Sequence, residues 1–259
     1  MNKLIKPGRN IFATGIIMLG ILCILSKDFI VGRPPSWPLA WQVNPVLAYL
    51  SASILMIAAM AIVVNKKTRT AALCIAILIF LLSVLRHLPH FMNDWLNAYK
   101  SMALFGGALI VASSAAAESN RIQSPGINRG YLLAGSVLLA VFFIAAGYAH
   151  FKFAAFVKDF IPAYIPFRMF WTYFCGICLI AGGTGLLIPQ ARKWAALLSG
   201  IMVLGWFILL HIPRFLSNVN DASDRMGLFE SFTFAGIFFV LAGVFQKKQI
   251  AADERFKID

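Results

Sequence analysis

Four histidines are the side chains best suited to chemistry in this chain of 259 residues. A motif of the form His-x-Pro-(basic)-Phe occurs twice, at His87–Phe91 and at His211–Phe215, and it contains three of them: His87, His90 and His211. The fourth, His150, stands apart from the motif. A neutral imidazole can ligate a metal or haem, or hydrogen-bond a quinone carbonyl. Such residues can equally cap helix ends or lie in the headgroup zone, because positive groups complement helix C-termini.

The spacing of the first motif argues against a metal site. His87 and His90 are not an i, i+4 pair, and Pro89 between them ends a helix. The common zinc motif therefore does not fit. We expect no metal site and leave the identity of any cofactor open, with a quinone as the candidate.

Three further groups could share a site with the histidines. Cys175 and Cys178 form a C-x-x-C pair, which can mark redox chemistry, although cysteine is also a common small buried residue. Glu230 falls inside an apolar run, where an ionisable group is a functional hypothesis by default. Pairing with Arg225 or Arg214 is the structural alternative. Arg214 could also hold an anionic ligand or a lipid headgroup.

The elements that position these residues are membrane helices. Sixty per cent of the residues are hydrophobic, 13% are charged and the mean hydropathy is +0.80. A soluble protein would lack the polar residues to cover its surface. Eight apolar runs are long enough to cross a bilayer. They are expected at 10–26, 43–64, 70–86, 99–117, 131–149, 168–188, 193–211 and 227–245.

The net charge of +13 does not indicate a nucleic-acid partner, because the basic residues form short clusters between apolar runs. Both ends of the chain and the alternate loops between them carry 14 of the 23 lysines and arginines. Cytoplasmic loops are enriched in these residues. We therefore expect a multi-pass protein of the cell (inner) membrane, in contact with lipid, with both termini in the cytoplasm.

The two motifs belong to a longer internal repeat with an offset of 124 residues. In this register Tyr49 falls on Tyr173, and 71–73 falls on 195–197 with the same residues. Because each half holds four spans, both halves have the same orientation. The sequence therefore predicts an all-α polytopic bundle of about eight transmembrane helices, built as two parallel four-helix repeats. The expected units are a first repeat at 1–120, a linker at 121–130, a second repeat at 131–246 and a polar tail at 247–259.

This topology puts all four histidines on one side of the membrane, the outer one. The outer loops 27–41 and 150–167 are long and rich in proline and aromatic residues. Such apolar loops are expected to lie against the bundle, since irregular backbone at membrane depth must be buried in protein. Any functional site is therefore expected at the outer face.

The second half resembles the DoxX-like membrane proteins. The resemblance is carried by Ala146–Phe151, by the glycine-rich run Cys175–Pro189 and by Arg192–Ala196. It implies a four-helix unit with a His-Phe pair ending its first helix, and a link to quinone-dependent redox chemistry. The acidic residue often found in that glycine-rich helix is missing here, and Ser26 replaces the histidine in the first half.

Three functions follow from these observations. The first is a quinone-associated redox protein or subunit, partnered by another membrane redox subunit. In this hypothesis His87, His150 and His211 hydrogen-bond the ring and Glu230 accepts a proton. The second is a non-catalytic scaffold or assembly protein, and the third is a small-solute carrier. The sequence leaves open whether the protein is an enzyme.

Overall fold

The computed structural model describes residues 3–32, 45–118 and 125–255, and this part of the chain is helical without a strand. Its long elements are α1 (Ile5–Ser26), α3 (Val46–Val63), α4 (Thr68–His87), α5 (Trp95–Glu118), α6 (Pro125–Lys152), α8 (Arg168–Leu187), α9 (Arg192–Trp206) and α11 (Ala222–Arg255). Short elements lie between them: η1 (Leu88–His90), α7 (Ala154–Val157), η2 (Lys158–Phe160), η3 (Phe207–His211) and α10 (Ile212–Ser217).

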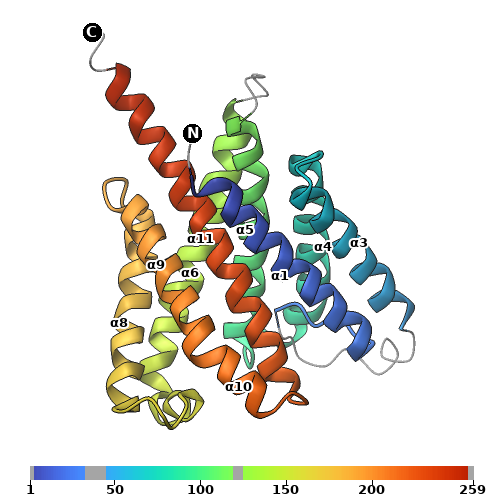
Figure 1. Cartoon of the computed structure of the whole chain (residues 1–259), viewed down its shortest axis with the longest axis vertical. Coiled ribbons are helices and arrows are strands. Elements are labelled where there is room, and N and C mark those ends of the chain that lie inside the picture. The colour runs from blue at the N-terminus through green and yellow to red at the C-terminus, as the bar shows by residue number, and fades with distance from the viewer. Residues whose placement is uncertain (1–2, 33–44, 119–124, 256–259) are drawn as a thin grey trace.

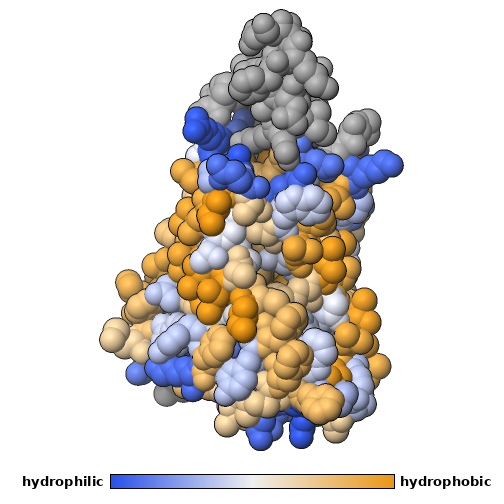
Figure 2. All heavy atoms as spheres, turned by 90° about the vertical axis from the view of Figure 1, so that its left-hand side faces the viewer, coloured by the Kyte–Doolittle hydropathy of each residue, from blue (hydrophilic) through white to orange (hydrophobic). Residues whose placement is uncertain are grey.

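Eight segments of the described chain are long and apolar enough to cross a membrane, with α9, η3 and α10 forming one of them. The predicted all-α membrane bundle is thus confirmed. Figure 2 shows one face of the molecule, which suits a bilayer: hydrophobic side chains predominate in its middle, and hydrophilic ones gather towards both ends. In lipid, helices of this kind satisfy their backbone hydrogen bonds internally.

Neighbouring helices along the chain pack against each other, and the series closes into a ring. Each long helix contacts the next, from α1 and α3 through to α9 and α11, and α11 then contacts α1. One further contact, between α5 and α11, crosses the middle of this ring. Figure 1 shows α11 and α1 running side by side through the molecule.

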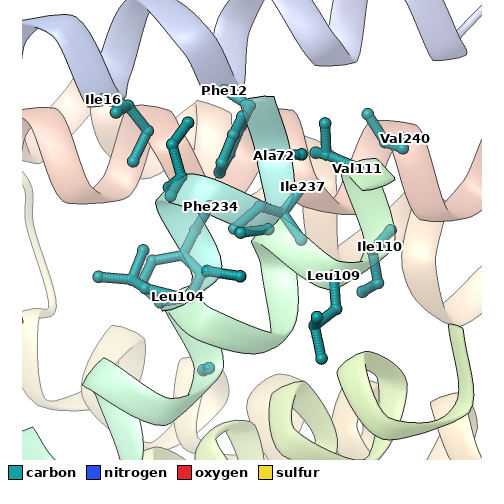
Figure 3. Packing of buried hydrophobic residues seen from close by; sticks show 14 of the residues in the cluster. Phe12, Ile16, Ala72, Leu104, Leu109, Ile110, Val111, Phe234, Ile237 and Val240 are labelled. Atoms are coloured by element: carbon teal, nitrogen blue, oxygen red, sulfur yellow. The ribbon is translucent and has the colours of Figure 1, made fainter. Parts of the chain in front are cut away.

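The core lies where α1, α5 and α11 meet. Phe12 and Ile16 of α1 and Leu104 of α5 are fully buried there, together with Ile237 and Val240 of α11 (Figure 3). In the apolar stretch of α11 that could cross a membrane, 78% of the residues are buried. The corresponding value for the α9–η3–α10 segment is 17%. Helix α11 is therefore the central one, whereas α9 and its continuation through η3 and α10 lie at the periphery of the bundle.

Small residues let α1 and α11 approach closely. A Cβ on Gly236 would lie 2.4 Å from the Phe12 nitrogen and 2.7 Å from the Gly8 carbonyl oxygen. A Cβ on Gly15 would meet the Thr233 hydroxyl. Backbones that come this near are typical of helix pairs in membranes, where dispersion contacts drive association.

The order of the helices agrees with the predicted repeat of 124 residues. The repeat itself stays a prediction. Shifted by 124 residues, α3 and α4 fall on α8 and on the α9 segment, and the neighbour contacts of one half have counterparts in the other. The 247–259 tail does not begin as a separate segment, since α11 continues to Arg255. Within the loop 27–41, which is predicted to be an outer one, residues 33–41 lie outside the described part, as do residues 121–124 of the predicted linker.

Candidate functional site: a pocket in the second half

A pocket of about 430 Å³ lies among α6, α8, the α9–η3–α10 segment and α11, and α7 and η2 line it as well. Its volume falls within the range of small-molecule sites. Most of its wall is apolar, with large contributions from Phe156, Phe160, Trp171, Trp206 and Leu210. Its polar groups come from His150, Thr172, Cys175, His211, Arg214, Ser223, Asp224 and Ser231. In Figure 1 these elements meet at the end of the bundle opposite the C-terminus.

The second His-x-Pro motif shapes one wall of this pocket. Pro213 has no N–H, so in α geometry the Leu209 carbonyl would lose its partner. The helix instead widens to a π-helix over Phe207–His211 and continues as α10. The Tyr164 hydroxyl donates a hydrogen bond to the Leu209 carbonyl. The proline therefore interrupts the α-helical hydrogen bonding beside a π-turn, a feature frequent at functional sites. It also leaves a carbonyl to which the 158–167 loop docks.

The pocket brings His150 and His211 together, from the ends of α6 and η3. The Nδ1 of His150 is 2.8 Å from the Ala146 carbonyl oxygen, one turn back on its own helix. No hydrogen bond of His211 is found among the described residues; its ring lies against Gly227 of α11, which also lines the pocket. Two imidazoles thus have ring nitrogens available in an apolar pocket.

Arg214 and Asp224 form a paired charge at the pocket wall. The Arg214 Nε donates to Asp224 at 2.8 Å, and its Nη1 donates to the Phe160 carbonyl at 3.1 Å. The guanidinium also lies 4.6 Å from the centre of the Phe160 ring. This pairing differs from the predicted one with Glu230. Arg214 therefore lines the pocket as a fixed group that ties α10 to α11 and to η2.

The first motif has a different environment. The Nε2 of His87 is 3.1 Å from the Ser101 hydroxyl on α5, and its Nδ1 is 3.5 Å from an Asp94 carboxylate oxygen. His87 is buried but does not line the pocket. The helix that ends at His87 has no π-turn and is followed by the 3₁₀ helix η1. His90, in η1, is exposed. The expected convergence of three histidines is thus limited to two.

Next to His87, the chain after α1 fills the space. Arg86 makes a two-pronged contact with Asp28, at 3.1 and 3.0 Å, and also donates to the Phe29 carbonyl. The side chains of Phe29 and Val31 are buried there. The equivalent stretch in the second half begins at Phe153, which is exposed. The two halves therefore differ in this region.

Glu230 joins the two halves and does not line the pocket. One carboxylate oxygen accepts from the Gly32 N–H at 2.8 Å, and the other lies 2.7 Å from the Lys100 ammonium. The expected partners Arg225 and Arg214 are not the ones observed. Lys100 is on α5 and Gly32 follows α1, so this carboxylate ties α11 to both.

The two cysteines of the C-x-x-C pair have different surroundings. Cys175 lines the pocket and Cys178, on the same helix, does not; both are free thiols. Within the described ranges no three histidine, cysteine or acidic side chains form a group that could hold a metal ion.

Sequence reasoning missed Asp224 and Tyr164. The sequence did contain a signal for the Tyr164 contact, because Pro213 leaves the Leu209 carbonyl without its helical donor.

Comparison with known proteins concerns mainly this region. The family model that matches is a domain of unknown function (DUF8561), over residues 139–224. That stretch includes His150, Cys175, His211 and Asp224, and with them most of the pocket wall. The DoxX-like resemblance is therefore wrong, since the matching model is of another family. No curated protein and no solved structure matches the chain.

Proposed function

We propose that this protein is a multi-pass protein of the cell (inner) membrane that binds a quinone-type ring in the second-half pocket. The observation that carries the proposal is the pocket itself, with its aromatic wall and two histidines. Lipophilic ring ligands bind in mostly apolar cavities, where a few placed polar groups fix their orientation. Eight apolar spans support residence in a bilayer, where such ligands are dissolved.

The distribution of basic residues supports cytoplasmic termini. The pocket then lies at the extracytoplasmic end, because α10 and the 158–167 loop are at the opposite end of the bundle from the C-terminus of α11 (Figure 1). Its ligand would enter from the outer leaflet, beside the outward-facing α9–η3–α10 segment.

The first test uses Cys175 as a reporter inside the pocket. The purified protein in mild detergent is treated with a maleimide, with and without a fully ring-substituted decyl benzoquinone, which has no free ring position for thiol addition. Alkylation at each cysteine is read by peptide mass spectrometry. We expect the quinone to slow labelling of Cys175 in a saturable way. Cys74 is exposed and lies outside the pocket, so its labelling is the internal control.

Filling the pocket should remove this protection. Gly227 lines the pocket, and a Cβ there would lie 3.3 Å from the His211 Nδ1. Gly227→Leu is therefore expected to raise the half-protecting quinone concentration about tenfold or more. Gly205→Leu is the matched control, because a Cβ on Gly205 meets nothing within 4 Å. Equal protection in both variants, or no protection in the unmodified protein, would refute the proposal.

A further inference from the structure

The hydrogen bond of His150 fixes which of its nitrogens carries the proton. The partner of Nδ1 is the Ala146 carbonyl oxygen, at 2.8 Å. A carbonyl oxygen only accepts, so Nδ1 must be the donor. In the neutral ring the other nitrogen, Nε2, then has no hydrogen and is an acceptor. No hydrogen bond to Nε2 is found among the described residues.

Two of the hydroxyl groups that line the pocket are also left as acceptors. Thr172 uses its hydroxyl hydrogen on the Arg168 carbonyl at 3.0 Å, and Ser231 uses its own on the Leu228 carbonyl at 2.9 Å. Both residues line the pocket. Their oxygens keep lone pairs but have no hydrogen to offer. The Arg214 Nε and Nη1 donors are directed at Asp224 and the Phe160 carbonyl.

We propose that the pocket recognises a hydroxyl donated by its ligand, so that it selects the reduced, hydroquinone form over the quinone. This inference rests on the proposed function. A hydroquinone donates its O–H to the Nε2 of His150, whereas a quinone carbonyl brings a second acceptor to that nitrogen. His211 has no fixed partner among the described residues and serves the second ring oxygen as donor or acceptor. A buried polar group without a partner costs about 1–3 kcal/mol, which corresponds to roughly 5- to 150-fold in affinity.

A matched pair of probes isolates this hydrogen bond without redox chemistry. Para-decylphenol and its methyl ether differ only in that O–CH3 replaces the O–H. With Cys175 protection as the readout, we expect the phenol to protect at a concentration roughly tenfold or more below that of the ether. The hydroquinone of the decyl benzoquinone, kept reduced under argon, should likewise protect at a lower concentration than the quinone.

Substitutions at His150 then assign the preference to this residue. His150→Phe is expected to abolish the difference between phenol and ether. His150→Gln should keep phenol binding but lose discrimination, because an amide can turn to accept or to donate. His90→Phe is the matched histidine control, since His90 is exposed and outside the pocket. Nitrogen-15 NMR of histidine-labelled protein gives a second readout, with Nδ1 of His150 expected to carry the hydrogen.

The outcomes separate the two proposals. Equal protection by phenol and ether, tighter binding of the quinone, or a hydrogen on Nε2 of His150 would overturn the inference while leaving quinone binding in place. If none of the four probes protects Cys175, the proposed function itself fails.

Discussion

Replacing Glu230 by leucine is expected to lower the free energy of unfolding by about 3–5 kcal/mol, because it leaves a partly buried ammonium without its partner. The Lys100 side chain is 17% exposed and that of Glu230 is 5% exposed, with 2.7 Å between their charged atoms. The substitution also leaves the Gly32 N–H without its acceptor. Unfolding in increasing fractions of dodecyl sulfate, followed by tryptophan fluorescence, measures the loss.

The double variant Lys100→Met with Glu230→Leu distinguishes two effects: the loss of the ion pair and the cost of leaving one charge without a partner. Well-packed apolar replacements of a buried pair are often neutral or stabilising, so the double variant should recover most of the stability. Asp159→Asn is the surface control. Its partner Lys158 is 3.9 Å away and both side chains are exposed, so little change is expected. A Glu230→Leu protein as stable as the unmodified one would refute a structural role for this pair.

Gly236→Val should be the second strongly destabilising change, at about 3 kcal/mol. The new Cβ would lie 2.4 Å from the Phe12 nitrogen and 2.7 Å from the Gly8 carbonyl oxygen. These are backbone atoms, so no side chain can turn aside and α1 must separate from α11. We expect a lower unfolding midpoint in dodecyl sulfate and less folded protein after detergent extraction.

Gly205→Val is the matched control for this substitution. It adds the same side chain in a membrane helix where a Cβ meets nothing within 4 Å. The control should unfold close to the unmodified protein. Similar losses in both variants would mean that valine in a helix, and not the close contact of α1 with α11, causes the effect.

Hydropathy predicted the eight helices because it depends on residues that are near in sequence. Side-chain partners across the bundle could not be predicted in this way. Glu230 has basic neighbours in sequence, yet its partner is Lys100 on a helix of the other half. The ring closure that brings α11 beside α1 decides this pairing, and no local pattern encodes it.

The two histidine motifs show a second limit of sequence reasoning. The same His-x-Pro spacing leads to a 3₁₀ turn after His87 and to a π-turn ending at His211. The difference depends on surroundings: Ser101 lies against the first histidine, whereas Tyr164 bonds the carbonyl beside the second. A motif therefore predicted where the helices are interrupted but not which histidines meet in one pocket.

Helix packing explains why the DoxX-like resemblance was misleading. A Cβ on Gly147 would lie 2.7 Å from the Gly176 carbonyl oxygen, and one on Gly183 would lie 2.7 Å from the Ala140 carbonyl oxygen. These glycines allow α6 and α8 to pack closely. Small residues at such spacing serve any close pair of membrane helices, so they carry little information about family.

The ring closure also sets an order of events during synthesis. α1 is made early, but the face that carries Phe12 and Ile16 packs in a core completed by α11, which is made after the seven other long helices of the described chain. While ribosome and translocon deliver the helices between them, that face of α1 has only lipid or the insertion machinery to contact. The first four helices therefore cannot complete their packing as a separate unit, and final assembly waits until α11 has been made.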